Sequence, residues 1–160
     1  MAEMSLAYFM KESNKEREIV EIPGVDSYRD KDGNIIPFRV KVLNQKEIDK
    51  IYEKWRKKEI VKEKNGRPLV DRGSVVYDNS LDANRALRDV IVNALEFPNL
   101  KDEKLRKFYE CEDVTDMPLL VFPKRREYDQ VVRDVLSVLG IGEDEEPEEK
   151  DRVEVEEAKN

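Results

Sequence analysis

The chain has 160 residues, 42% of them charged, with one cysteine and no histidine. Its length suits a single domain with its own core. The lack of histidine removes the commonest general base and metal ligand, and one cysteine forms neither an intramolecular disulfide nor a Cys/His zinc site. No apolar run approaches the roughly 18 residues of a membrane span, and the N-terminus shows no basic leader with a cleavage motif. We therefore expect a cytoplasmic protein that has no membrane segment, no metal and no cofactor.

Charge is concentrated at the C-terminus. Residues 143–160 contain ten acidic and three basic residues, a net charge of −7, which equals the net charge of the whole chain. This segment has no aromatic residue and too little apolar surface to offset the entropy cost of ordering it. We expect residues 1–142 to form a single compact α+β domain and residues 143–160 to be an acidic disordered tail. A neutral domain with an acidic tail gains no long-range attraction to nucleic acid.

The first predicted element is a short helix over residues 5–15. Ser5 is a possible N-cap, and Leu6, Phe9 and Met10 follow with the i, i+3, i+4 spacing of one apolar helix face. This face is a candidate partner-binding surface, with packing on the domain's own sheet as an alternative that stays open.

The next segment, residues 18–43, changes to a period of two. Apolar residues alternate after the Asp32-Gly33 pair, which favours a tight turn, at Ile36, Phe38, Val40 and Val42. The pattern predicts a β-hairpin, with Pro23 and Pro37 at irregular or edge positions. The sheet edge near Pro37 is a second, weaker candidate for partner binding.

An amphipathic helix is predicted over residues 45–58. Asn44 is a good N-cap, and the apolar spacing i, i+3, i+4, i+7 is formed by Ile48, Ile51, Tyr52 and Trp55. For residues 59–77 two interpretations stay open. The Asn65-Gly66 pair favours a hairpin, but the flanking arms are short and Pro68 weakens one of them, so a flexible excursion is also compatible.

The remaining sequence is mostly helical. A helix over residues 81–97 should stop at Phe97 because Pro98 lacks an amide donor and restricts the residue before it. Further helices are expected at residues 101–110, capped by Asp102, at 113–122, with a proline in the first turn, and at 124–140, ended by Gly140. The Phe97-Pro98 corner is interpreted as scaffold, with Phe97 buried where two helices meet. The predicted fold class is α+β, with a small β-hairpin or short antiparallel sheet near the N-terminus followed by a mostly helical C-terminal half.

No catalytic constellation is present in the sequence. The six glycines stand singly rather than in a phosphate-binding loop. The acidic pair Asp113 and Asp116 is interpreted as helix caps and solvated side chains rather than as an acid/base pair. The segment 30–34, DKDGN, lacks the glycine offset and the bidentate glutamate of a calcium loop and is interpreted as a turn. We expect no enzymatic activity.

The order of these motifs resembles that of the XkdN-like phage tail assembly chaperones. In that family an FP-acid/Asn-L corner leads to a helix with leucine and tyrosine, then to paired leucines, then to a Pro-(x)-x-x-EY stretch, with two or three residues between the proline and the glutamate, that opens the last helix. The positions that match are Phe97, Pro98, Asn99, Leu100, Leu105, Tyr109, Leu119, Leu120, Pro123, Glu127 and Tyr128. The likeness spans most of residues 4–141.

The resemblance implies a function in tail morphogenesis. It implies a cytoplasmic chaperone of a phage or prophage that binds the tape measure protein and is not retained in the mature virion. A structural or interaction protein of a prophage tail cluster without chaperone activity is the alternative. The sequence does not indicate an oligomeric state, nucleic-acid binding or membrane binding.

Overall fold

The computed structural model describes residues 5–141, and the acidic segment 143–160 lies outside them. Helices and β-strands are both present, which agrees with the α+β class. The described residues form two compact units, each treated by itself below. Unit 1 contains residues 5–43, 94–98 and 124–141, and unit 2 contains residues 44–93 and 99–123. The expectation of one compact domain over residues 1–142 stays a prediction.

Unit 1 is built on a three-stranded antiparallel sheet. Its strands are β1 (Ile19–Ile22), β2 (Phe38–Lys41) and β7 (Leu95–Phe97), in the order β1-β2-β7. The predicted hairpin is confirmed, because β1 pairs with β2 from Ile19↔Lys41 to Ile22↔Phe38. At its tip, Asp30 Oδ1 accepts hydrogen bonds from the backbone N–H groups of Asp32 and Asn34, at 2.9 and 3.0 Å.

Pro37 lies at an irregular position outside any strand, as expected, but the sheet edge expected near it is not part of β2. This proline directly precedes β2, and β2 is the central strand rather than an edge strand. The strand β2 is hydrogen-bonded to β1 on one side and to β7, which comes much later in the sequence, on the other. The strand β2 itself therefore has no free edge, and partner binding at the edge of this sheet stays a prediction.

The helix α5 (Arg125–Val138) completes unit 1. Gln130 Nε2 donates a 3.0 Å hydrogen bond to the carbonyl oxygen of Gly24, just after β1. A side chain at Gly24 would place Cβ 1.9 Å from the carbonyl oxygen of Ile36, so only glycine fits this close approach. Gly140 ends the helix region at φ 75°, as predicted. The buried apolar residues of unit 1 are Ile22, Val25, Phe38, Val40, Leu43, Ala94, Leu95, Val131 and Val135.

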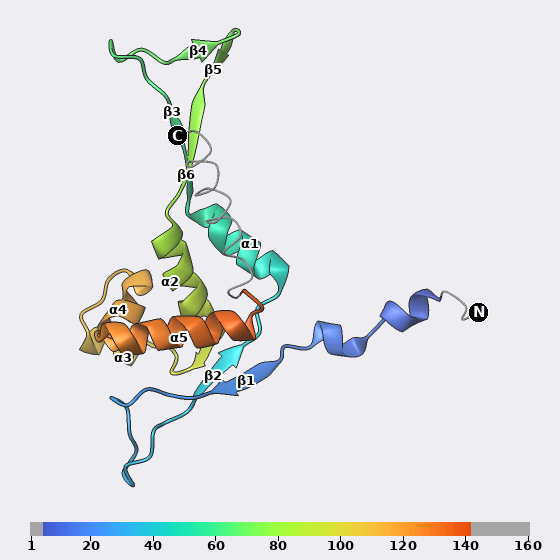
Figure 1. Cartoon of the computed structure of the whole chain (residues 1–160), viewed down its shortest axis with the longest axis vertical. Coiled ribbons are helices and arrows are strands. Elements are labelled where there is room, and N and C mark those ends of the chain that lie inside the picture. Colours follow the sequence, from blue (N-terminus) through green and yellow to red (C-terminus); the bar gives the residue numbers. More distant parts are fainter. Residues whose placement is uncertain (1–4, 142–160) are drawn as a thin grey trace, which may run out of the picture. The chain divides into compact units, whose positions relative to one another are not determined.

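Unit 2 holds the shorter helices and most of α2. They are α1 (Gln45–Lys54), α2 (Ala83–Ala94, whose last residue belongs to unit 1), α3 (Glu103–Phe108), α4 (Met117–Val121) and the 3-10 helix η3 (Val114–Asp116). Asn44 caps α1 in a capping box with Glu47, and Asp102 caps α3 by accepting from the N–H groups of Lys104 and Leu105. Figure 1 labels α1, α2, α3 and α4.

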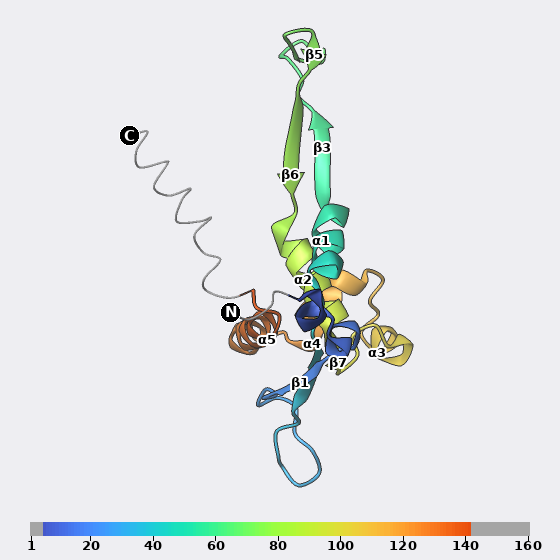
Figure 2. The same ribbon diagram turned by 90° about the vertical axis from the view of Figure 1, so that its right-hand side faces the viewer.

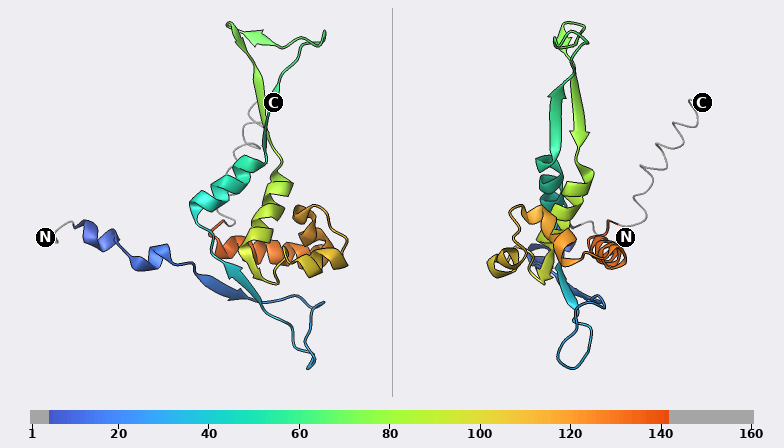
Figure 3. Two further views of the ribbon diagram at one scale, coloured as in Figure 1. Left: turned by 180° about the vertical axis from the view of Figure 1, so that it is seen from behind. Right: turned by 90° about the vertical axis from the view of Figure 1, so that its left-hand side faces the viewer.

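A two-stranded antiparallel ribbon in unit 2 begins at Arg56, within the range 45–58 for which the sequence predicts a helix. The helix α1 stops at Lys54, and β3 (Arg56–Ile60) pairs antiparallel with β6 (Tyr77–Leu81). Figure 2 and Figure 3 show the two strands side by side. The expected helix through Lys58 is wrong, because pairing with β6 overrides the helical propensity of a Lys/Glu-rich segment.

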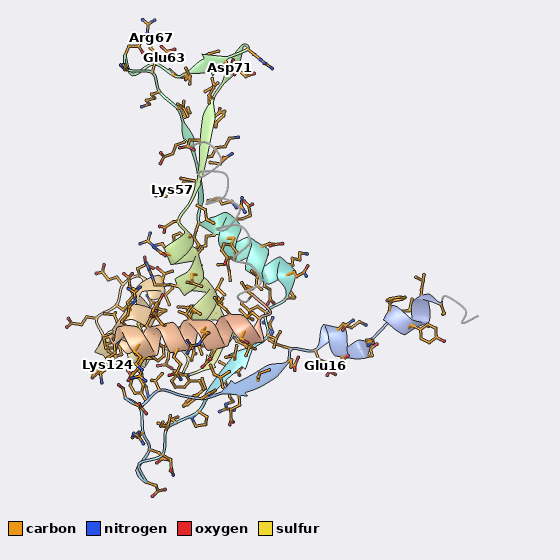
Figure 4. The ribbon with its side chains drawn as sticks, viewed as in Figure 1. Glu16, Lys57, Glu63, Arg67, Asp71 and Lys124 are labelled. Atoms are coloured by element: carbon orange, nitrogen blue, oxygen red, sulfur yellow. The ribbon has the colours of Figure 1, made fainter. Side chains whose placement is uncertain are left out.

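The far end of the ribbon confirms the hairpin interpretation of residues 59–77. The Gly66 N–H donates to the Glu63 carbonyl at 2.9 Å, and Gly66 has φ 83°, which glycine adopts at no steric cost. A second small pair, β4 (Val70–Asp71) with β5 (Ser74–Val75), follows this turn. Figure 4 labels Glu63, Arg67 and Asp71 in this region and Lys57 on β3.

The Phe97-Pro98 corner differs from the sequence prediction. The helix α2 ends at Ala94, and the next three residues form β7 rather than a last helical turn. The register of β2 against β7 shifts between Arg39 and Val40, which pair with Phe97 and Leu95 respectively. Arg39 and Val40 point to opposite faces of the sheet, so this β-bulge puts Leu95 and Phe97 on opposite faces although they are two residues apart. Leu95 is 2% exposed, whereas Phe97 is 43% exposed. The expected burial of Phe97 between two helices is therefore wrong.

Candidate partner-binding site

The three side chains predicted to bind a partner lie at the beginning of the described chain, in unit 1. The 3-10 helix η1 (Leu6–Phe9) contains two of them, and Met10 is its C-cap. Leu6, Phe9 and Met10 are 74%, 78% and 75% exposed. They are not buried against the described part of the sheet, contrary to the alternative in which they pack there. Their binding role stays a prediction.

Local hydrogen bonds hold this segment in shape. The Ser5 side chain accepts from the N–H of Ala7 at 3.2 Å, as expected of an N-cap, and the Met10 N–H donates to the Ala7 carbonyl at 3.2 Å. A second 3-10 helix, η2 (Glu12–Lys15), follows, and Figure 4 labels Glu16 directly after it. The Val42 N–H then donates to the Glu18 carbonyl at 2.8 Å and ties the segment to the sheet.

Tyr8 belongs to this surface although the helical spacing did not select it. It is 69% exposed on the same short helix. An α-helical period of 3.6 assigns Tyr8 to the face opposite Leu6, but a 3-10 helix has three residues per turn and no buried face here. Leu6, Tyr8, Phe9 and Met10 are hereafter called the N-terminal apolar segment.

Several large apolar side chains outside this segment are also exposed. Phe108 is 77% exposed, and Leu119 and Leu120 are 44% and 37% exposed. In α4 the buried residues are instead Met117, Pro118 and Val121. A continuous apolar run carries no period, so the sequence could not distinguish the two exposed leucines from their buried neighbours.

Phe97 is the exposed residue that the sequence analysis placed in the core. On the outer face of the sheet, its ring lies 5.6 Å from the guanidinium carbon of Arg39. This cation–π contact covers one side of the ring. The strand β7 pairs with β2 on one edge only and is an outer strand of its sheet.

In unit 2, the buried carboxylate of Asp89 forms several hydrogen bonds. Asp89 on α2 is 4% exposed, and its Oδ2 accepts a 2.8 Å hydrogen bond from Trp55 Nε1, at the end of α1. Its Oδ1 accepts from Asn93 Nδ2 at 2.8 Å, and Lys54 Nζ lies 3.5 Å from Oδ2. Asp89 also lines an open hollow of about 410 Å³ that Lys50, Lys54 and Lys101 border. These contacts position the segment from which the ribbon starts, and they satisfy the carboxylate as a structural group.

The acidic pair Asp113 and Asp116 has the structural role that the sequence predicted. Asp113 Oδ1 accepts from the Thr115 hydroxyl at 2.8 Å and from the Thr115 N–H at 3.0 Å, which makes Asp113 the N-cap of η3. The Thr115 hydroxyl lowers the pKa of Asp113 below its ordinary value, and the Thr115 amide and Arg85 act in the same direction. Asp116 Oδ1 lies 3.8 Å from Arg88 Nη2.

The thiol of the single cysteine, Cys111, is a weak hydrogen-bond donor to the backbone. Cys111 Sγ donates to the carbonyl oxygen of Asp113 at 2.9 Å. Burial raises the pKa of the Cys111 thiol, and the nearby Asp116 carboxylate raises it further. The thiolate, which is the nucleophilic form, is therefore scarce near neutral pH.

Two negative findings apply to residues 5–141. In this part of the chain, no three or more Cys, Asp or Glu side chains are grouped so that they could hold a metal ion. None of the helices described in this range has the length and apolar character needed to cross a membrane.

Comparisons with known proteins give consistent results. A sequence model of the phage XkdN-like tail assembly chaperone proteins matches residues 6–159. The uncharacterized protein YqbN of Bacillus subtilis (strain 168) is 30% identical over 139 residues, which cover 87% of this chain and 86% of YqbN. The phage-like element PBSX protein XkdN of the same strain is 28% identical over the same shares of both chains. A crystal structure of YqbN has the same fold, with a TM-score of 0.66 at 22% identity, over 87% of this chain and 98% of the solved chain.

Proposed function

The chain belongs to the phage XkdN-like tail assembly chaperone family, and we propose that it binds the tape measure protein during tail morphogenesis. It acts in the cytoplasm of the host cell and leaves before the tail is complete, so that it is not part of the mature virion. Its work is non-covalent binding, without a catalytic step, metal or cofactor.

The observation that carries this proposal is the exposure of the N-terminal apolar segment. Four large apolar side chains within five residues are each at least 69% exposed. Exposed apolar clusters mark sites of interaction with other proteins. The backbone around Glu18 ties the chain that follows the segment to the sheet, while the four side chains themselves stay exposed.

The physical task fits such a segment. A tape measure protein is a long helix-rich chain, and its apolar stripes aggregate when they are not covered. A chaperone has to cover a stripe and later release it, which favours a small interface over a large permanent one. A short segment with four apolar side chains provides a contact of this size.

Charge contributes less than apolar contact in this proposal. The chain without residues 143–160 has no net charge, so it offers little electrostatic steering to a partner. We therefore expect the complex to survive moderate salt.

Co-expression is the direct test. The cognate tape measure protein should be soluble when both proteins are expressed and should aggregate when it is expressed alone. The triple variant Leu6→Ser, Phe9→Ser, Met10→Ser should lose this effect. The matched control Glu12→Ser, Lys15→Ser, Glu16→Ser changes three exposed polar side chains of the neighbouring segment and should keep it.

Two outcomes would overturn the proposal. The first is a tape measure protein that stays insoluble at equal expression of the wild-type chain. The second is the presence of this chain as a stoichiometric part of purified tails, which would make it a structural tail protein instead.

A further inference from the structure

The register of the ribbon gives its two faces different chemistry. The strands pair from Arg56↔Leu81 to Ile60↔Tyr77, and paired residues share a face while neighbours along a strand alternate. One face, hereafter the apolar-basic face, carries Arg56, Lys58, Ile60, Tyr77, Asn79 and Leu81. The opposite polar face carries Lys57, Glu59, Asp78 and Ser80.

The apolar-basic face is uncovered within the described chain. Ile60, Tyr77 and Leu81 are 45%, 46% and 40% exposed, and every residue of both strands is exposed. A two-stranded ribbon is only marginally stable in water without a further layer on one face. A partner that covers these three side chains would supply that layer.

The charge on this face has one sign. Lys58 Nζ lies 4.3 Å from the centre of the Tyr77 ring, and Arg56 is on the same face. Among residues 5–141, Glu53 of α1 forms an exposed ion pair with Arg56, 3.5 Å from its Nε. The acids of the two paired strands, Glu59 and Asp78, are on the polar face. A complementary partner therefore presents acidic residues beside its apolar ones.

We propose that the apolar-basic face docks an amphipathic α-helix of the partner, whose apolar stripe is flanked by Asp and Glu residues. The inference rests on the proposed function, since it specifies which helices of the tape measure protein the chain would select. Tyr77 and Leu81 are four residues apart on one strand, roughly 13 Å at 3.3 Å per residue. That distance spans about two and a half turns of a helix, so apolar residues repeated along one helix face reach both side chains.

Two other occupants fit this face less well. A strand added to the edge of the ribbon would bind backbone groups and leave the apolar side chains on the face uncovered. A second copy of this chain, joined face to face about a two-fold axis, would place one basic surface against an identical basic surface.

The test uses the full chain and two synthetic helical peptides. Both are fluorescein-labelled 21-residue peptides with leucine along one face, flanked by glutamate in the first and by lysine in the second. Fluorescence anisotropy at a series of chain concentrations should show that the glutamate-flanked peptide binds at least tenfold more tightly.

Substitutions on the two faces then locate the contact. Tyr77→Ser with Leu81→Ser should weaken binding of the glutamate-flanked peptide at least tenfold. The matched control Lys57→Ser with Asp78→Ser, on the polar face of the same strands, should change the affinity for this peptide less than twofold. Arg56→Glu with Lys58→Glu keeps the apolar residues and should reverse the preference toward the lysine-flanked peptide. Circular dichroism confirms the folding of each variant.

The outcomes separate this inference from the proposed function. Equal binding of both peptides, or equal weakening by both double serine variants, would overturn the inference. Self-association of the wild-type chain that the Tyr77/Leu81 variant abolishes would overturn it in favour of a second copy. Because the peptide measurement does not involve the tape measure protein, its failure is independent of the result of co-expression.

Discussion

Ser27 Oγ donates a 2.6 Å hydrogen bond to Glu127 Oε1, which joins two residues 100 positions apart in the sequence. Glu127 is 8% exposed, and its Oε2 has no hydrogen-bond partner within the described protein. The Ser27 hydroxyl is thus a side-chain hydrogen-bond donor to a largely buried carboxylate. This contact fixes the first turn of α5 to the loop that follows β1, inside unit 1.

Removing this hydroxyl should destabilise the protein. Ser27→Ala leaves the Glu127 carboxylate without the donor, and an unsatisfied buried acceptor costs about 1–3 kcal/mol. Urea unfolding followed by circular dichroism measures the difference. The control Ser13→Ala, in the exposed helix η2, should stay within about 0.5 kcal/mol of wild type. Equal stabilities of the two variants would contradict the assigned role of Ser27.

Leu95 and Phe97 offer a second, matched comparison on one strand. Leu95→Ala removes a fully buried side chain and should cost about 2–5 kcal/mol. Phe97→Ala removes a ring that is 43% exposed and has Arg39 on one side. The variant loses a cation–π contact of about 0.5–1 kcal/mol and the partial burial of the ring, so it should be destabilised clearly less than Leu95→Ala. Chemical denaturation of both variants ranks them. A Phe97→Ala variant that is less stable than Leu95→Ala would show that the bulge does not direct Phe97 outward.

The features that could be predicted from the sequence are those set by neighbouring residues. The caps at Ser5, Asn44 and Asp102 form as predicted because each side chain meets an amide two or three residues ahead. The hairpin around Asp32-Gly33 forms because its alternation and its turn agree. Local chemistry determines both kinds of feature.

The features that were missed depend on distant pairing. The segment that became β3 has the composition of a helix, and it is a strand because Tyr77–Leu81 pairs with it. The strand β7 has three residues directly after a helix, and its bulge against β2 decides the exposure of Phe97. Of the candidate site, the sequence located Leu6, Phe9 and Met10, but their exposure followed only from the structure.

The pKa of Asp113 leads to a prediction about pH. Because the folded protein holds this pKa below its ordinary value of 3.8, the ionised carboxylate stabilises the fold above that value. The contribution falls as the pH drops below about 4 and is lost once the pH passes the folded pKa. Asp113→Asn should therefore lower the melting temperature at pH 7, and the difference from wild type should narrow at pH 3.

A control separates this effect from general acid sensitivity. Glu103→Gln removes an exposed carboxylate that pairs with Lys107 at 3.3 Å, and such surface pairs contribute about 0–1 kcal/mol. Its melting temperature should follow that of wild type at both pH values. A constant difference between Asp113→Asn and wild type from pH 7 to pH 3 would contradict the lowered pKa.

The ribbon should open more readily than the sheet of unit 1. The strands β3 and β6 have no buried residue, whereas β2 is a central strand with Phe38 and Val40 at 2% and 0% exposure. Local opening costs little where few apolar contacts are lost, so backbone amides of β3 and β6 should exchange with deuterium at least about tenfold faster than those of β2. Hydrogen–deuterium exchange followed by mass spectrometry resolves the two segments as separate peptides. If the ribbon of the isolated chain is protected as well as β2, something already covers the ribbon. If protection of the ribbon rises when the glutamate-flanked peptide is added, the peptide binds on the ribbon.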